Sequence, residues 1–148
     1  MKKLTVILMS LASAFLLFGS NHTEVTISGN DSMQFDVKSF NASAGSDFKL
    51  TFKNTGKLPK IAMGHNLVIL KKGISAIKFG QKVMAAGGSA TNALPQSVMD
   101  DVLVATKLLG PGESEVLNFK VPLEKGSYQY VCTFPGHFAM MRGVMEVE

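Results

Sequence analysis

The sequence has no tryptophan, one cysteine and three histidines among 148 residues. A single cysteine cannot form an internal disulfide, so the chain is not a small domain held together by disulfides. Three histidines are too few for an enzyme that binds several metal ions through imidazole. Charge of one sign is also scarce, because 15 basic residues stand against 11 acidic ones and no basic block is present. This balance argues against nucleic acid as the main partner.

An apolar stretch, Leu4 to Phe18, follows Lys2 and Lys3. This pattern is typical of a secretory signal peptide, and the stretch is short for a membrane span, which needs about 20 residues. We therefore expect residues 1–20 to be a signal peptide and residues 21–148 to be one domain in the periplasm, with no membrane segment once the signal is removed. The alternative is a retained anchor. A lipid anchor on an N-terminal cysteine is excluded, because no cysteine lies near the end of the stretch.

Short segments of alternating polar and apolar residues recur along the rest of the chain. Residues 48–53 are the clearest half-buried strand, and residues 67–70 are nearly all apolar, which predicts burial on both faces. Residues 74–86 favour a helix, although Gly80 weakens this prediction, and residues 89–101 are predicted to be a loop. The predicted strands are residues 25–28, 33–40, 48–53, 67–70, 103–107, 116–121, 128–132 and 143–147. Their number and spacing predict an all-β fold, a Greek-key β-sandwich or barrel of seven or eight strands with one short helical insertion.

The single cysteine, Cys132, stands at the end of a predicted strand and begins a loop with further metal-binding side chains. His137 follows five residues later and Met141 nine residues later. Thiolate, thioether and imidazole together suit copper, because soft sulfur ligands hold Cu(I) and imidazole also satisfies Cu(II). Pro135 and Gly136 turn the loop sharply, so that the three side chains can reach one point.

A trigonal copper site of this kind needs a second histidine. His65 is the candidate, because it directly precedes the apolar run 67–70, whereas His22 lies beside the end of the signal. The alternative is that Cys132 is a small buried hydrophobe and Met141 an ordinary core residue. The combined spacing favours a metal site over these separate explanations.

These motifs closely resemble those of the azurins, in the cupredoxin family of type 1 blue copper proteins. The resemblance covers nearly everything after residue 23. It implies one copper ion held by His65, Cys132 and His137, with Met141 as a weak axial ligand. The backbone carbonyl of Gly64 would lie opposite the methionine, where only a glycine lets the main chain approach so closely. The matching segments are Gly29–Phe35, Leu58–Lys60, Met63–Asn66, Cys132–His137 and Met141–Gly143.

The resemblance also implies how the ligands are supported. Asn66 would tie the first ligand loop to the cysteine loop through Thr133, and the backbone N–H groups of Asn66 and Phe134 would donate to the Cys132 sulfur. The alternative is that Asn66 is only a turn residue.

The chain also departs from the family. Leu67 stands where the family often has a tryptophan, and Asn54 stands where a known member has a histidine near the site. The family disulfide is missing, because the matching positions are Thr23 and Gly45.

The predicted function is that of a one-electron carrier that cycles between Cu(I) and Cu(II). An enzyme is not expected, because protein ligands would fill the coordination positions that a substrate needs. The alternatives are a copper storage or delivery module and a copper-free β-sandwich used for adhesion.

His137 follows Pro135 and Gly136 in an exposed turn, so one edge of its ring should reach the surface, whereas His65 lies beside a buried strand and should not. The resemblance further predicts an uncharged patch around His137. Such a patch fits short-lived docking of a redox donor and acceptor, such as a c-type cytochrome, by a monomer or weak oligomer. The alternative is that these residues are simply core. The patch residues are Met33, Leu58, Met63, Phe134, Pro135, Gly136, Ala139 and Met140.

Overall fold

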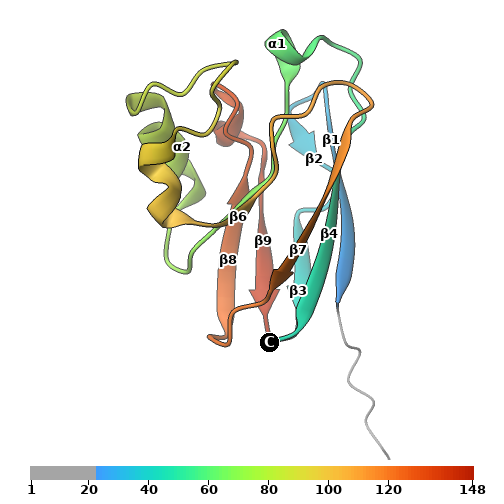
Figure 1. The fold of residues 1–148 in the computed structure, drawn as a ribbon, viewed down its shortest axis with the longest axis vertical. Coiled ribbons are helices and arrows are strands. Elements are labelled where there is room, and N and C mark those ends of the chain that lie inside the picture. Colours follow the sequence, from blue (N-terminus) through green and yellow to red (C-terminus); the bar gives the residue numbers. More distant parts are fainter. Residues whose placement is uncertain (1–22) are drawn as a thin grey trace, which may run out of the picture.

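Two β-sheets packed face to face form the body of the computed structural model, which describes residues 23–148 (Figure 1). Each sheet is mixed, because β1 runs parallel to β4 and β3 runs parallel to β9. One sheet contains, in spatial order, β2 (Gln34–Phe35), β1 (Glu24–Asn30), β4 (Asp47–Asn54) and β7 (Ser114–Lys120). The other contains β3 (Ser39–Ala42), β9 (Arg142–Val147), β8 (Gly126–Val131), β5 (Val68–Leu70) and β6 (Val102–Ala105).

The predicted all-β sandwich is confirmed, with nine strands in residues 23–148 instead of seven or eight, and these strands do not close into a barrel. The predicted signal peptide, residues 1–20, lies outside the described residues. No helix in residues 23–148 has both the length and the apolar character needed to cross a membrane.

The prediction of one continuous strand over residues 33–40 is wrong. The chain pairs with β1 as β2, then leaves this sheet and joins β9 of the other sheet as β3. The crossing is fixed at Asp36, whose carboxylate accepts hydrogen bonds from the N–H of Ser28 at 2.7 Å and of Val37 at 2.8 Å. Alternation continues on both sides of the crossing because β2 and β3 both contribute side chains to the same core. The pattern therefore does not reveal the change of sheet.

The core between the sheets follows directly from alternation in the strands. In β4, Phe48, Leu50 and Phe52 are buried, whereas Lys49 and Lys53 are exposed. Burial of each of these apolar side chains contributes about 1.5–3 kcal/mol. A shift of one residue in register would exchange the two faces, so this burial fixes how β4 pairs with its neighbours.

A second, smaller core explains why β5 is apolar throughout. Ile69 faces the core between the sheets, while Val68 and Leu70 face a cluster that includes residues of α2 (Ala76–Ala85) on the outside of the second sheet (Figure 1). Helix α2 corresponds to the predicted helix 74–86. Three further short helices were not predicted, namely α1 (Lys60–Met63) and the 3-10 helices η1 (Gln96–Asp101) and η2 (His137–Ala139), of which η1 lies within the predicted loop 89–101.

A buried amide joins the end of β4 to a neighbouring loop. Asn54 is 2% exposed. Its Nδ2 donates to the carbonyl of Leu109 at 3.0 Å, and its Oδ1 accepts from the N–H of Gly56 at 2.9 Å. Leu109 in turn exchanges two backbone hydrogen bonds with His65, at 3.0 and 2.7 Å. Asn54 therefore supports the segment that carries one of the predicted ligands.

Replacing Asn54 with alanine should lower the free energy of unfolding by about 1–3 kcal/mol, because the Leu109 carbonyl and the Gly56 N–H each lose a buried partner. Asn118→Ala is the control, since Asn118 is exposed on β7. Unfolding in denaturant measures both variants. Equal stability of the two would show that the Asn54 amide contributes nothing beyond an exposed asparagine.

Candidate metal centre

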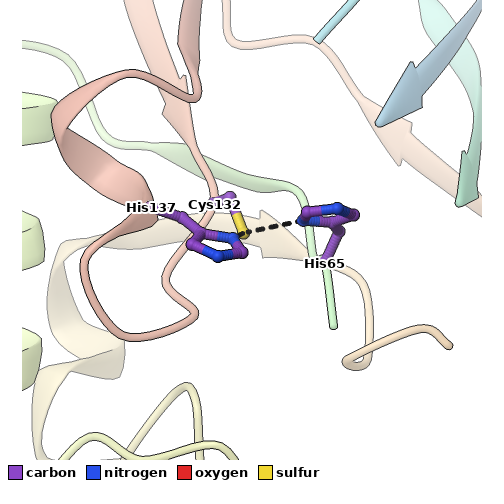
Figure 2. A group of neighbouring side chains, drawn as sticks. All are labelled: His65, Cys132 and His137. Carbon is purple, nitrogen blue, oxygen red and sulfur yellow. Dashed lines mark hydrogen bonds between the residues drawn. The ribbon is translucent and has the colours of Figure 1, made fainter. Parts of the chain in front are cut away.

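Three side chains from two distant parts of the chain converge at one point. His65 follows α1, Cys132 follows β8, and His137 begins the 3-10 helix η2 (His137–Ala139). One ligand atom from each lies within 4.8 Å of the others. The Sγ of Cys132 is 3.6 Å from Nδ1 of His137 and 4.0 Å from Nδ1 of His65, and Figure 2 shows both rings beside the sulfur.

Backbone hydrogen bonds close the loop that carries Cys132 and His137. The N–H of Cys132 donates to the carbonyl of Met141 at 3.0 Å, and the N–H of Met141 donates to the carbonyl of His137 at 2.8 Å. Gly136 makes the turn with φ at 80°, a conformation that glycine adopts at little cost. A local turn therefore brings residues that are nine apart in sequence to the same point.

Met141 is fully buried beside this cluster. A Cβ added at Gly29 would lie 2.5 Å from the Cε of Met141 and 3.5 Å from the Cδ2 of His65, so the thioether and the imidazole border the same space. Gly64 precedes His65 in an extended conformation, and a Cβ there would meet the carbonyl of Lys60 at 2.7 Å. Close approach of the main chain, not an unusual φ, therefore requires a glycine at position 64.

Burial sets the protonation of the three convergent groups. Desolvation raises the pKa of Cys132 to about 12, against the N–H groups of Asn66 and Phe134, which favour the thiolate. Desolvation also lowers the pKa of His137 to about 4, with the nearby His65 acting in the same direction. It lowers the pKa of His65 as well. At neutral pH both imidazoles therefore keep lone pairs free, and a thiolate here requires a cation beside it.

The chemistry of the donors fits copper. Two neutral imidazoles, a thiol that a metal would deprotonate and a thioether form the mixed nitrogen and sulfur set that copper accepts in both oxidation states. The Nε2 of His65 is buried without a hydrogen-bond partner, while its Nδ1 faces the sulfur. The Nδ1 atoms of both rings are therefore the ones placed to bind a metal.

Asn66 and Thr133 connect the two ligand-bearing segments. The Asn66 Nδ2 donates to Thr133 Oγ1 at 2.8 Å, and the Thr133 N–H donates to Asn66 Oδ1 at 2.8 Å. Both side chains are buried, at 1% exposure each. Two reciprocal bonds across 67 residues of sequence are more than a turn residue makes, so they link His65 to the Cys132 loop. The sequence pattern did not single out Thr106, whose hydroxyl accepts from the Leu67 N–H at 2.9 Å and ties the same segment to β6.

The residues of the predicted patch differ in exposure. Leu58 and Met140 are 45% and 52% exposed, whereas Phe134 is 6% exposed and packs its ring 4.6 Å from that of His137. His137 is itself 3% exposed and His65 is fully buried, so only a small part of the His137 ring reaches the surface. Met33, Met63 and Pro135 are partly buried, and Gly136 and Ala139 are exposed. Ile61, at 62% exposure, lies near Met63 on α1 and is an apolar residue that the sequence reasoning missed.

Comparison with known proteins gives one consistent answer. The family described as "Copper binding proteins, plastocyanin/azurin family" matches residues 21–148. The chain is 39% identical over 127 residues to the azurin of Alcaligenes faecalis, covering 84% of this chain and 97% of that protein. It is 36% identical over 149 residues to the azurin of Achromobacter denitrificans, covering 99% of this chain and 97% of that protein.

Solved structures agree with the sequence comparisons. Dithionite-reduced auracyanin from Roseiflexus castenholzii superposes with a TM-score of 0.74 at 34% identity, covering 86% of this chain and 98% of that one. An azurin from Methylomonas sp. strain J superposes with a TM-score of 0.72 at 31% identity, covering 85% and 98%. With His65, Cys132, His137 and Met141 positioned to hold one type 1 copper ion, the chain belongs to the plastocyanin/azurin family of copper-binding proteins and is a blue copper electron carrier.

Proposed function

We propose that the protein carries single electrons in the periplasm, with His65, Cys132 and His137 as equatorial ligands of the copper ion. Met141 would add a weak thioether ligand, and the backbone carbonyl of Gly64 would approach the ion as well. The observation that carries this proposal is the buried convergence of two imidazole Nδ1 atoms on one cysteine sulfur. When bound, copper supplies a one-electron couple between Cu(I) and Cu(II).

The protein contributes a fixed and dry ligand set. Cys132 and His65 are 0% exposed, and the reciprocal bonds between Asn66 and Thr133 hold their segments together. A ligand set that moves little on gain or loss of an electron allows fast transfer. The N–H groups of Asn66 and Phe134, which favour the Cys132 thiolate, help to set the potential.

Burial of the proposed ligands also favours an electron carrier over an enzyme or a copper delivery module. An enzyme needs an open position at the metal or a nucleophile with its base, whereas four protein donors surround this site behind buried side chains. A delivery module needs ligands that a partner can reach, and Cys132, His65 and Met141 are all fully buried. We infer that the protein is a carrier and not an enzyme or a copper chaperone.

Electrons enter and leave through the apolar patch around His137. Exposed Leu58 and Met140 carry no charge, and His137 is the more exposed of the two ligand histidines, at 3% against 0%. Redox encounters are small and short-lived, so an uncharged contact avoids the cost of desolvating charge. The partners are a donor and an acceptor protein such as a c-type cytochrome, and the carrier acts as a monomer or weak oligomer after export by the residue 1–20 signal.

Titration of the purified apoprotein with Cu(II) tests this function directly. Wild type should develop an intense visible absorption, and Cys132→Ser should not, because the band requires a copper–thiolate bond. His22→Ala removes the histidine that is not proposed as a ligand, so it is the control and should develop the same colour as wild type. A blue Cys132→Ser protein would show that the sulfur ligand lies elsewhere.

Met141→Leu should retain the blue colour and raise the reduction potential. A weak axial donor stabilises Cu(II) slightly more than Cu(I), and an apolar side chain removes this preference. Voltammetry of wild type and variant measures the shift, in which each ~59 mV corresponds to a tenfold change in the one-electron equilibrium. An unchanged or lower potential would count against Met141 as the axial ligand.

Met63→Lys should slow electron self-exchange and partner reduction without changing the absorption spectrum, because it places a charge in the patch. Leu123→Lys is the matched control, since Leu123 is 82% exposed in the connection between β7 and β8, at the end of β8 away from Cys132. Both rates are compared at low ionic strength, where surface charge is least screened. If the two variants transfer electrons equally fast, electrons enter and leave through another face of the protein.

A further inference from the structure

Helix α2 contains a glycine, Gly80, that its own backbone does not require. Glycine in a helix interior is unfavourable relative to alanine. Gly80 does not have a positive φ, and it lies in the middle of the helix that runs from Ala76 to Ala85. The reason for this glycine must therefore be sought in what packs against it.

Phe138 occupies the space that a side chain at position 80 would fill. A Cβ built on Gly80 would overlap Cβ, Cγ and Cδ1 of Phe138, the last at 2.6 Å, well inside the distance that real Cβ atoms keep. Gly80 is itself buried. The missing side chain thus forms a notch in α2 that receives the Phe138 ring.

Phe138 is the neighbour of the ligand His137 in η2. It is partly buried and packs against a hydrophobic cluster that includes Phe79 and Val83 of α2. The same cluster contains Val131, the residue directly before Cys132. Helix α2 therefore contacts both ends of the segment that runs from the cysteine to the histidine.

The helix is anchored to the sheet, and the turn is held from its other side. The N–H of Ala76 donates to Gln129 Oε1 on β8 at 2.7 Å. Nη1 of Arg142 donates to the carbonyl of Phe138 at 3.4 Å and also to the carbonyl of Ala139. The turn is thus clamped between β9 and α2.

A turn this short depends on such clamps. Helix η2 has three residues, begins after the left-handed Gly136 and has poor intrinsic hydrogen-bond geometry. Two backbone hydrogen bonds close the turn after His137. The N–H groups of Met140 and Met141 both donate to the His137 carbonyl, at 3.0 and 2.8 Å. External packing therefore opposes rotation of the turn, and of the imidazole that it carries, about the backbone of Gly136.

We propose that Phe138, seated in the notch at Gly80, is a positioning residue that holds His137 in place, and that the insertion helix α2 exists in part to present this notch. The inference rests on the proposed function only in taking His137 as a copper ligand. Phe138 acts through the backbone of η2 and does not touch the metal.

Two measurements test the proposal on Phe138→Ala and Gly80→Ala. The first is copper affinity, measured by competition with a chelator. Both variants should bind copper more weakly, on the order of 10-fold, as for the loss of other groups that orient a ligand. The second is hydrogen exchange in the apoprotein, where the amides of Met140 and Met141 should exchange faster.

Matched variants separate positioning from general packing. Gln81→Ala changes an exposed neighbour on α2 and should leave both measurements at the wild-type values. Phe138→Leu keeps an apolar side chain in the notch and should lie much closer to wild type than Phe138→Ala. Gly80→Ala should weaken copper binding even though alanine is the better helix former.

The proposal is overturned if Phe138→Ala and Gly80→Ala unfold at lower temperature but keep wild-type copper affinity and wild-type exchange at Met140 and Met141. That result would make the contact packing alone. Failure of wild type to form a blue copper site would instead refute the proposed function, and exchange in the apoprotein would still decide whether Phe138 holds the turn.

Discussion

Burial of the Cys132 sulfur between two neutral imidazoles is the constraint on which the rest of the structure depends. Burial favours the protonated thiol, with a pKa of about 12, and it holds the pKa of His137 near 4. The groups are thus stable without charge when no cation is present, yet they leave two lone pairs and one ionisable sulfur at a single point. Within the site only the contacts of the Cys132 sulfur with the two Nδ1 atoms, at 3.6 and 4.0 Å, join the three side chains, so the surroundings must hold them in place.

The surroundings do this with hydrogen bonds between segments that are far apart in sequence. The bonds between Asn66 and Thr133 cross 67 residues, and the bond from Asn54 to the Leu109 carbonyl crosses 55. Leu109 then pairs with His65. Each bond is buried, where an unpaired partner would be costly, so the ligand loops have one arrangement of low free energy. This fixed arrangement is what electron transfer needs, since little has to move when the charge on the site changes.

Local parts of this structure could be predicted from the residues themselves, whereas non-local parts were predicted through the family resemblance, as for Asn66 with Thr133, or were not predicted at all. The loop from Cys132 to Met141 is closed by its own turn, so its spacing alone indicates a metal site. Alternation identified most strands, because each strand has one face in the core. It failed at residues 33–40, where the sheet changes at Asp36 but the core face does not. The role of Asn54 also escaped prediction, since its partner Leu109 is distant in sequence and is contacted through a backbone carbonyl.

Gly80 shows the same limit in a helix. Intrinsic propensity counts a glycine against a helix by about 1 kcal/mol relative to alanine, and the sequence prediction was weakened for this reason. The structure contains the helix because Phe79, Val83 and the cluster beneath them bury apolar surface that outweighs this cost. A residue that argues against the helix in isolation is the one that lets the helix approach η2.

The missing disulfide bears on the opposite end of the molecule. By the family resemblance, the missing cysteines would stand at Thr23 and Gly45, and a disulfide closing a loop of this order contributes about 3 kcal/mol. Here backbone hydrogen bonds close that end: the Thr23 carbonyl accepts from Lys49 at 2.8 Å, and Gly45 donates to Val121 at 3.1 Å. Each contributes about 1 kcal/mol. Both lie where β4 begins, whereas the ligand segment joins β4 at its other end through Asn54. The contacts at the Thr23 end are therefore separate from those that position His65.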